Sequence, residues 1–304
     1  MQSLTNYYKY LPVSREDENW GLCVLNAGCS RILPHETYPS AGHPSHHNFD
    51  WAQGRILHDE YQVIYITRGR GKFESEQSGL VPVRAGMAIL LFPGVWHRFM
   101  PDPDSGWDEY WVGFHGRVLD QLMDGAYFPP HQAVCTIGIN EELLLTFERI
   151  LEQTRHEKPG YQPLISGAVL YMLGQLYAQT KRVSFPSTDH IEDIVGKAII
   201  LFREQVEQNI SAESIAQQLQ VGYSWFRKVF KTYTGIAPGQ YLIQLKVEKA
   251  KALLMDQDKS IKQIAFALHF DSGFYFSRLF KLKTGLSPEK YREGMRTTLK
   301  QLPL

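Results

Sequence analysis

The chain has 304 residues, of which 43% are hydrophobic and 21% charged, and its formal net charge is zero. This length predicts two domains, and this composition argues against a disordered or membrane-embedded protein. No apolar run reaches about 18 residues, and residues 1–20 lack the pattern of a signal peptide, so we expect a cytoplasmic protein without a membrane-spanning segment. Three cysteines without metal-ligand spacing, Cys23, Cys29 and Cys135, fit reduced thiols in that compartment.

Short runs of β-forming residues occupy residues 21–116, bounded by Gly, Pro and Asp. The clearest are residues 61–68, 71–76, 87–93 and 109–115. Residues 68–71 (Arg-Gly-Arg-Gly) and 82–86 have the composition of tight turns. Short strands with turns this close together predict an antiparallel sandwich or barrel.

Aromatic and charged side chains gather near the end of this region. They are Trp96, His97, Arg98, Trp107, Asp108, Glu109, Tyr110 and Trp111. A sugar site needs a flat apolar face and charged groups that bind hydroxyls, and a tryptophan beside an arginine and a glutamate supplies both. Tryptophans at alternate strand positions are more often core residues, so Trp111 has two open interpretations, ligand platform and core. We assign Trp96 and Trp107 to the core or the rim.

Residues 141–156 and 163–180 carry apolar side chains at a 3.6-residue period, which predicts two amphipathic helices. In the first, the apolar stripe consists of Leu143, Leu144, Phe147, Ile150 and Leu151. We expect this stripe to pack on the predicted strands. Residues 181–189 are polar with one proline and predict an interdomain linker, followed by a helix over residues 191–206.

A helix-turn-helix pattern then occurs twice, at residues 211–242 and 260–292. Shared residues recur 49 positions later before the turn and 50 positions later after it. In each copy a serine suits the helix N-cap (Ser211, Ser260), with Ser260 and Gln263 forming a capping box. In each copy a glycine suits the end of the second helix (Gly235, Gly285), and a proline begins the next (Pro238, Pro288). Two such units predict a bipartite DNA-binding module.

A helix over residues 238–254, about 26 Å long at 1.5 Å per residue, joins the two copies and suits adjacent major grooves. The second helix of each copy has a polar and basic outer face. Its residues are Ser224, Arg227, Lys228 and Lys231 in the first copy, and Phe274, Ser277, Arg278 and Lys281 in the second. Residues 190–304 contain 17 Lys and Arg against 11 Asp and Glu, a surplus of +6, whereas residues 1–189 contain 15 against 21. A basic module fits contact with DNA phosphates, although an ordinary solvated surface can carry six charges.

These motifs resemble those of a known family. Residues 192–296 resemble the DNA-binding domain of the AraC/XylS family of bacterial transcription regulators, and residues 264–293 match the family's C-terminal signature almost throughout. The resemblance implies that residues 224–233 and 274–283 are recognition helices. It also implies that Ser224, Arg227 and Lys228, with Phe274, Ser277 and Arg278, face base edges, and that one of the helices in residues 141–180 forms a homodimer seam.

Residues 20–120 resemble the cupin-like sensor domain that many members of this family carry. In a sugar-responsive member, Arg98, Glu109 and Trp111 align with sugar contacts, and Arg55 aligns with a further contact after one gap. Metal-binding cupins use a His-x-His pair, but this chain has His58-Asp59-Glu60 and keeps only the later His97. His43, His46 and His47 lie in a Gly/Pro/Ser-rich stretch that is typical of a surface loop.

We therefore predict an α+β protein of two domains. Residues 1–134 form an antiparallel cupin-like β-barrel, 135–182 a helical dimerisation segment, 183–190 a linker, and 191–304 an all-α domain with two helix-turn-helix units. The predicted function is that of a ligand-responsive transcriptional regulator, not an enzyme, without a cofactor. Its expected partners are double-stranded DNA, a sugar or polysaccharide-derived effector, a second copy of the chain and RNA polymerase. Two alternatives stay open: a metal-dependent cupin enzyme fused to a DNA-binding module, and a constitutive DNA-binding protein whose barrel only dimerises.

Overall fold

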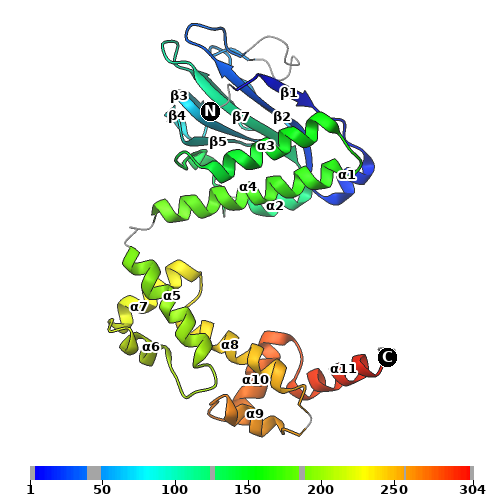
Figure 1. The fold of residues 1–304 in the computed structure, drawn as a ribbon, viewed down its shortest axis with the longest axis vertical. Coiled ribbons are helices and arrows are strands. Elements are labelled where there is room, and N and C mark those ends of the chain that lie inside the picture. Colours follow the sequence, from blue (N-terminus) through cyan, green and yellow to red (C-terminus); the bar gives the residue numbers. More distant parts are fainter. Residues whose placement is uncertain (1–3, 40–48, 124–126, 185–188, 257, 302–304) are drawn as a thin grey trace. The chain divides into compact units, whose positions relative to one another are not determined.

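The computed structural model describes residues 4–39, 49–123, 127–184, 189–256 and 258–301. Contacts divide the chain into two compact units, Met1–Pro186 and Ser187–Leu304 (Figure 1). The first unit contains an antiparallel sheet with helices, and in the described residues of the second unit all regular secondary structure is helical, which confirms the predicted fold class. No helix in these described ranges is both long and apolar enough to cross a membrane.

The sheet of the first unit is built around one long strand. Its strands are β1 (Tyr7–Tyr10), β2 (Cys23–Ile32), β3 (Tyr61–Ser75), β4 (Gly79–Arg84), β5 (Met87–Leu91), β6 (His97–Pro101), β7 (Trp107–His115) and β8 (Val134–Thr136). The first half of β3 pairs with β5 and β7, and its second half pairs with β4 and β6. The sheet therefore folds over about β3, so that β6 comes to face β7 across the interior.

The prediction of two strands joined by a turn at residues 68–71 is wrong, because β3 runs unbroken through these residues. The glycines bend the strand instead of ending it. Gly69 has a left-handed φ of 81°, and a Cβ on it would lie 2.1 Å from the carbonyl oxygen of Gly106. The predicted turn at residues 82–86 is also too long, since β4 extends to Arg84 and the turn follows it.

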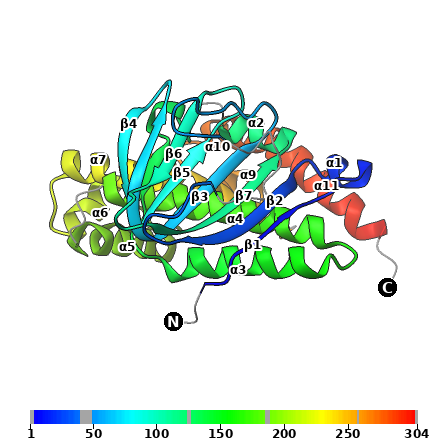
Figure 2. The same cartoon turned by 90° about the horizontal axis from the view of Figure 1, so that it is seen from above.

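Successive side chains of each strand point to opposite faces of the sheet, one toward the helices and the next toward the interior. Tyr65 of β3 and Tyr110 of β7 both pack on Phe147 of α3 (Glu141–His156), with ring centroids 6.2 and 5.8 Å apart. The predicted apolar stripe of α3 is confirmed, with Leu143, Phe147, Ile150 and Leu151 buried and Leu144 packed against the same core. α4 (Tyr161–Ser184) pairs with α3 beside the sheet, as Figures 1 and 2 both show. Two shorter helices complete the unit, α1 (Arg15–Trp20) and α2 (Arg117–Met123).

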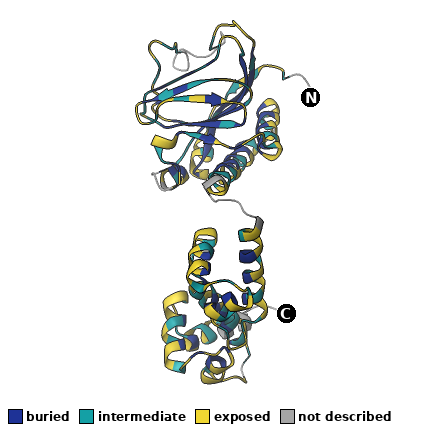
Figure 3. Cartoon of the chain, turned by 90° about the vertical axis from the view of Figure 1, so that its left-hand side faces the viewer, coloured by how far each residue is buried: buried dark blue, intermediate teal, exposed yellow. Residues whose placement is uncertain are grey.

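The second unit contains two helical cores that share one helix. Its helices are α5 (Asp189–Glu204), α6 (Ala212–Gln218), α7 (Tyr223–Thr234), α8 (Pro238–Leu253), α9 (Ile261–Ala267), α10 (Gly273–Thr284) and α11 (Pro288–Gln301). The first core joins α5, α6, α7 and the first half of α8, and the second joins the remainder of α8 to α9 and α10. In Figure 3 the buried residues of these helices face inward.

Local chemistry explains the ends of these helices. Ser211 and Ser260 cap α6 and α9, and the predicted capping box of Ser260 with Gln263 is present. Gly235 and Gly285 follow α7 and α10 with left-handed φ angles of 81°, as expected of glycine at that position. Equivalent phenylalanines are completely buried in the two cores, namely Phe226 and Phe230 in the first, Phe276 and Phe280 in the second. The repeat in the sequence is therefore a repeat of structure.

Candidate functional sites

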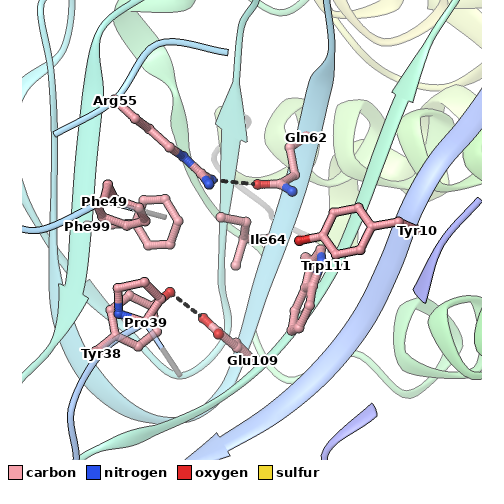
Figure 4. Close-up of a pocket in the computed structure, with 10 residues that line it drawn as sticks. All are labelled: Tyr10, Tyr38, Pro39, Phe49, Arg55, Gln62, Ile64, Phe99, Glu109 and Trp111. Carbon is pink, nitrogen blue, oxygen red and sulfur yellow. Dashed lines mark hydrogen bonds between the residues drawn. The ribbon is translucent and has the colours of Figure 1, made fainter. Parts of the chain in front are cut away.

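A pocket opens between the two halves of the folded sheet. Its lining residues are Tyr10, Tyr38, Pro39, Phe49, Arg55, Gln62, Ile64, Phe99, Glu109 and Trp111 (Figure 4). The cavity has a volume of ≈ 40 Å³, enough for a few water molecules. Three of the four predicted ligand residues, Arg55, Glu109 and Trp111, lie in this one pocket although they come from separate segments of the chain.

Glu109 and Trp111 share the inner face of β7 because they are two residues apart on one strand. Trp111 stands opposite Gly28 of β2, and a Cβ on Gly28 would lie 2.2 Å from the indole ring. The glycine therefore provides the space that lets the tryptophan lie against the strand. On the other side of the pocket, the Tyr38 hydroxyl donates a hydrogen bond of 3.0 Å to Glu109 Oε2.

The Glu109 carboxyl is almost completely shielded from water, with 6% of its surface exposed. Burial raises its pKa to about 7, while the hydroxyl of Tyr38, the indole of Trp107 and the charge of Arg55 each favour the ionised form. At neutral pH the pocket therefore holds a carboxyl group near the midpoint of its titration. Such a group can both accept and donate hydrogen bonds to a ligand.

The backbone of Arg55 pairs with that of His97 in an isolated antiparallel bridge, and this pairing places the Arg55 side chain at the pocket. Its Nε donates to His97 Nε2 at 3.1 Å, and a terminal nitrogen donates to Gln62 Oε1 at 3.3 Å. The guanidinium also packs on the rings of Phe49 and Phe99, 4.8 and 5.5 Å from their centroids. These contacts hold a cation in one orientation inside a largely apolar sheet.

The protonation state of His97 follows from its two partners. A guanidinium only donates hydrogen bonds, so Nε2 must accept from Arg55, and the ring proton sits on Nδ1, 3.0 Å from the carbonyl oxygen of Val95. Burial, together with the charge of Arg55, lowers the pKa of His97 to about 3. His97 is thus a neutral acceptor for Arg55, and a metal ion at this imidazole would have to displace the guanidinium.

Behind Arg55 a chain of hydrogen bonds crosses the interior of the sheet. Gln62 Nε2 donates to Asn26 Oδ1 and to Glu60 Oε1, both at 3.4 Å. Asn26 Nδ2 donates to both oxygens of Glu60 at 3.2 Å. Burial raises the pKa of Glu60, although the hydrogen bonds from Asn26 oppose the shift. The chain fixes the amide of Gln62 and hence one of the groups that orient Arg55.

The cupin-type metal set is not assembled by these residues. Within the described part of the chain, no group of three or more His, Cys, Asp or Glu side chains gathers to hold a metal ion. The His58 side chain is exposed, whereas Glu60 and His97 are buried and bound to Asn26 and Arg55. The predicted loop histidines His43, His46 and His47 lie outside the described residues.

Arg98, the fourth predicted ligand residue, does not line this pocket. Arg98 follows His97 and precedes Phe99 on β6, and since these neighbours face the interior, Arg98 points to the opposite side of the strand. Its Nε donates to Glu74 Oε2 at 2.7 Å and a terminal nitrogen donates to the Trp51 carbonyl oxygen at 2.6 Å. The guanidinium lies over the ring of Trp51, 4.3 Å from the centroid.

Trp96 and Trp107, the two tryptophans assigned to the core or the rim, occupy such places. Trp107 is fully buried, and its ring meets the edge of Tyr38 at 5.6 Å. Trp96 is half-buried and donates from Nε1 to the carbonyl oxygen of Gln53 at 2.9 Å. Sequence reasoning missed Tyr10, Tyr38 and Gln62 as pocket residues. Of these three residues, only Gln62 could have been noticed in the sequence, because it is the one amide in an otherwise apolar run.

The second candidate site is the outer surface of α7 and α10. Of the eight predicted DNA contacts, seven have exposed side chains and Ser277 is half-buried. The pKa of the Glu213 carboxyl on α6 is lowered by hydrogen bonds from its own backbone N–H and from its hydroxyl partners. The nearby charge of Arg227 on α7 adds a smaller effect in the same direction. Because α7 and α10 bury their phenylalanines inward, their basic residues are left on the surface.

Comparison with known proteins finds relatives of both units. A family model described as an AraC-like ligand binding domain matches residues 37–173, and one described as a helix-turn-helix domain matches residues 215–294. The MmsAB operon regulatory protein of Pseudomonas aeruginosa is 30% identical over 268 residues, which cover 87% of this chain and 85% of that protein. The raffinose operon transcriptional regulatory protein RafR of Pediococcus pentosaceus is 22% identical, over 90% of this chain and 94% of that protein.

Among solved structures, the DNA-binding domain of AdpA in complex with a target DNA is 27% identical, covering 36% of this chain and 97% of that chain, with a TM-score of 0.34. The matched domains and the full-length relatives define a DNA-binding transcriptional regulator with a ligand-binding domain. The chain belongs to the AraC/XylS family, with its sensor domain at the N-terminal end.

The raised pKa of Glu109 predicts a specific dependence of stability on pH. The folded state holds the proton more tightly than the unfolded state, so the free energy of unfolding should fall as pH rises from about 4.5 to about 7. In Glu109→Gln this decrease in the free energy of unfolding should be smaller by about 3 kcal/mol between these pH values, as measured by urea unfolding at several pH values. The control is Glu76→Gln, an exposed glutamate that should keep the wild-type slope. Equal slopes in wild type and Glu109→Gln would contradict a carboxyl whose pKa is raised by burial.

Proposed function

We propose that the first unit binds a sugar-like effector in the pocket of Figure 4 and that the second unit binds operator DNA. The observation that carries the proposal is the convergence of an indole face, a carboxyl and a guanidinium on one pocket. One similar regulator is named for a raffinose operon, which agrees with a carbohydrate effector. Effector binding regulates the protein if the effector prefers one arrangement of the two units.

Each pocket group suits one part of a sugar. The indole of Trp111 offers a flat apolar face for C–H groups, Glu109 binds hydroxyls, and the fixed guanidinium of Arg55 donates to ring or hydroxyl oxygens. The cavity of ≈ 40 Å³ is smaller than a sugar ring, so entry requires lining side chains to move. We propose that the Tyr38 hydroxyl gives up its hydrogen bond to Glu109 and that an effector hydroxyl replaces it.

Calorimetric titration of the full chain, after a thermal-shift screen of mono- and oligosaccharides, tests this proposal. Glu109→Gln and Arg55→Met should each weaken binding about 10- to 150-fold, because a buried charged hydrogen-bond partner is lost. Arg98→Met is the matched control, since the structure places this arginine on the outer face of β6, and it should keep wild-type affinity. Wild-type affinity in both pocket variants would place the effector site elsewhere.

For DNA we propose that Arg227 and Arg278 contact bases, whereas Lys231 and Lys281 contact phosphates. Replacing either arginine by alanine should cost about 1–3 kcal/mol at the preferred site and relax specificity locally. Each lysine lost should weaken all sequences alike and reduce the log-log salt slope by about 0.9. Lys197→Ala, a basic residue exposed on α5, is the control for a general loss of charge. Unchanged binding in the double variant Arg227→Ala/Arg278→Ala would refute the assignment.

We further propose that the chain forms a homodimer through α4. The exposed face of α4 is apolar, with Leu164 and Tyr171 on it. It also contains small residues at helical spacing, namely Gly167, Gly174 and Ala178. A Cβ on either of these glycines would meet nothing within 4 Å, so a second helix can approach closely. The outer face of α3 is instead mostly charged, which favours α4 over α3 as the seam.

Sedimentation equilibrium tests the seam with two matched variants. Leu164 and Leu145 are both exposed leucines, 63% and 45% exposed, but they lie on α4 and α3 respectively. Leu164→Asp should weaken dimerisation by more than about tenfold, because a charge would be buried in the interface, whereas Leu145→Asp should not. Dimers of wild-type stability in Leu164→Asp would exclude this face of α4.

A further inference from the structure

The most exposed large apolar side chain in the described part of the second unit lies on α10. Phe274 is 80% exposed, although phenylalanine normally avoids water. Phe274 is not part of the second core, in which Phe276 and Phe280 of the same helix are completely buried. The equivalent residue of the first copy is the polar Ser224, at an offset of 50. The exposed ring is therefore a property of α10 that the repeated fold does not require.

The surroundings of Phe274 are basic. Arg278 follows four residues later and Lys281 seven residues later, which places all three on one face of α10. Both basic side chains are exposed. An apolar ring on a cationic helix face suits a partner that offers negative charge together with an apolar group. Double-stranded DNA meets this requirement, since its phosphates are anionic and its major groove displays the C5-methyl of thymine.

Resting on the proposed DNA binding, we propose that Phe274 contacts the methyl group of a thymine in the major groove, beside the base pair that Arg278 contacts. Phe274 is the second residue of α10, and the first turns of a recognition helix are those that reach base edges. Arginine pairs best with guanine, and four helical residues span about 6 Å, so the thymine lies within about two base pairs of a guanine.

The two half-sites then differ in chemistry. At the corresponding positions α7 presents Ser224, Arg227 and Lys228, of which none offers an apolar surface of this size. A serine hydroxyl forms hydrogen bonds with several base edges and does not distinguish thymine by its methyl group. We therefore infer that only the half-site bound by α10 depends on a thymine methyl, so the operator is asymmetric for each copy of the chain.

The test uses the full-length chain and a duplex selected from a randomised pool. Each thymine of the selected site is replaced singly by deoxyuridine, which removes only the C5-methyl. One replacement, within about two base pairs of a guanine, should weaken wild-type binding about fourfold, as expected for one buried methyl group. Phe274→Ser should bind the thymine and deoxyuridine duplexes equally, and Ser224 shows that this fold accepts serine at the equivalent position.

Leu282→Ala is the matched control, because Leu282 is 78% exposed on the last turn of the same helix. It should retain the fourfold preference for thymine. The inference is overturned if no deoxyuridine replacement affects the wild type, or if Phe274→Ser keeps the preference. It is equally overturned if Phe274→Ser binds the selected duplex as the wild type does, which would assign the ring to a protein partner. If the wild-type chain selects no sequence, the proposed DNA binding itself fails, an outcome distinct from these.

Discussion

The structure of the sensor unit depends on how it accommodates charge inside an apolar sheet. Arg55 is held between the imidazole of His97, the amide of Gln62 and two phenylalanine rings. A buried guanidinium without such partners would be costly, because its solvation by water is lost. His97 can accept from Arg55 only while it is neutral, a state that burial of the ring favours, and Gln62 is oriented by its bonds to Asn26 and Glu60. The same requirement gives the pocket a fixed cation opposite Glu109.

In the DNA-binding unit the charged residues of interest lie on the surface instead of in the interior. Its predicted contact residues are on the outside, and its two small cores contain mainly aromatic and aliphatic side chains in matching positions. Because the cores are equivalent, differences between the copies are concentrated on the outer faces. Arg227 of the first copy aligns with Ser277 of the second, and Lys228 aligns with Arg278. The repeat thus provides two similar supports for two different contact surfaces.

The sequence predicted best those features that depend on neighbouring residues. Helix ends at Ser260 and Gly285 are determined by caps within a few residues, and both were predictable. The pairing of Glu109 with Trp111 also followed from the two-residue period of a strand. Features that depend on distant segments were missed. Tyr38 reaches Glu109 across 71 positions, and the unbroken course of β3 depends on the contact of Gly69 with Gly106. Strict alternation on β6 would have excluded Arg98, since Phe99 beside it is the apolar residue.

We propose that an effector in the pocket around Glu109 changes the affinity of the second unit for DNA. Thermodynamic linkage tests this coupling most directly. The sugar that binds best in the thermal-shift screen is titrated into the full chain with and without selected operator duplex, and the duplex is titrated with and without that sugar. If the two sites are coupled, the sugar changes the duplex affinity and the duplex changes the sugar affinity by one common factor that differs from unity. A sugar that binds in the pocket but leaves the operator affinity unchanged would contradict the coupling.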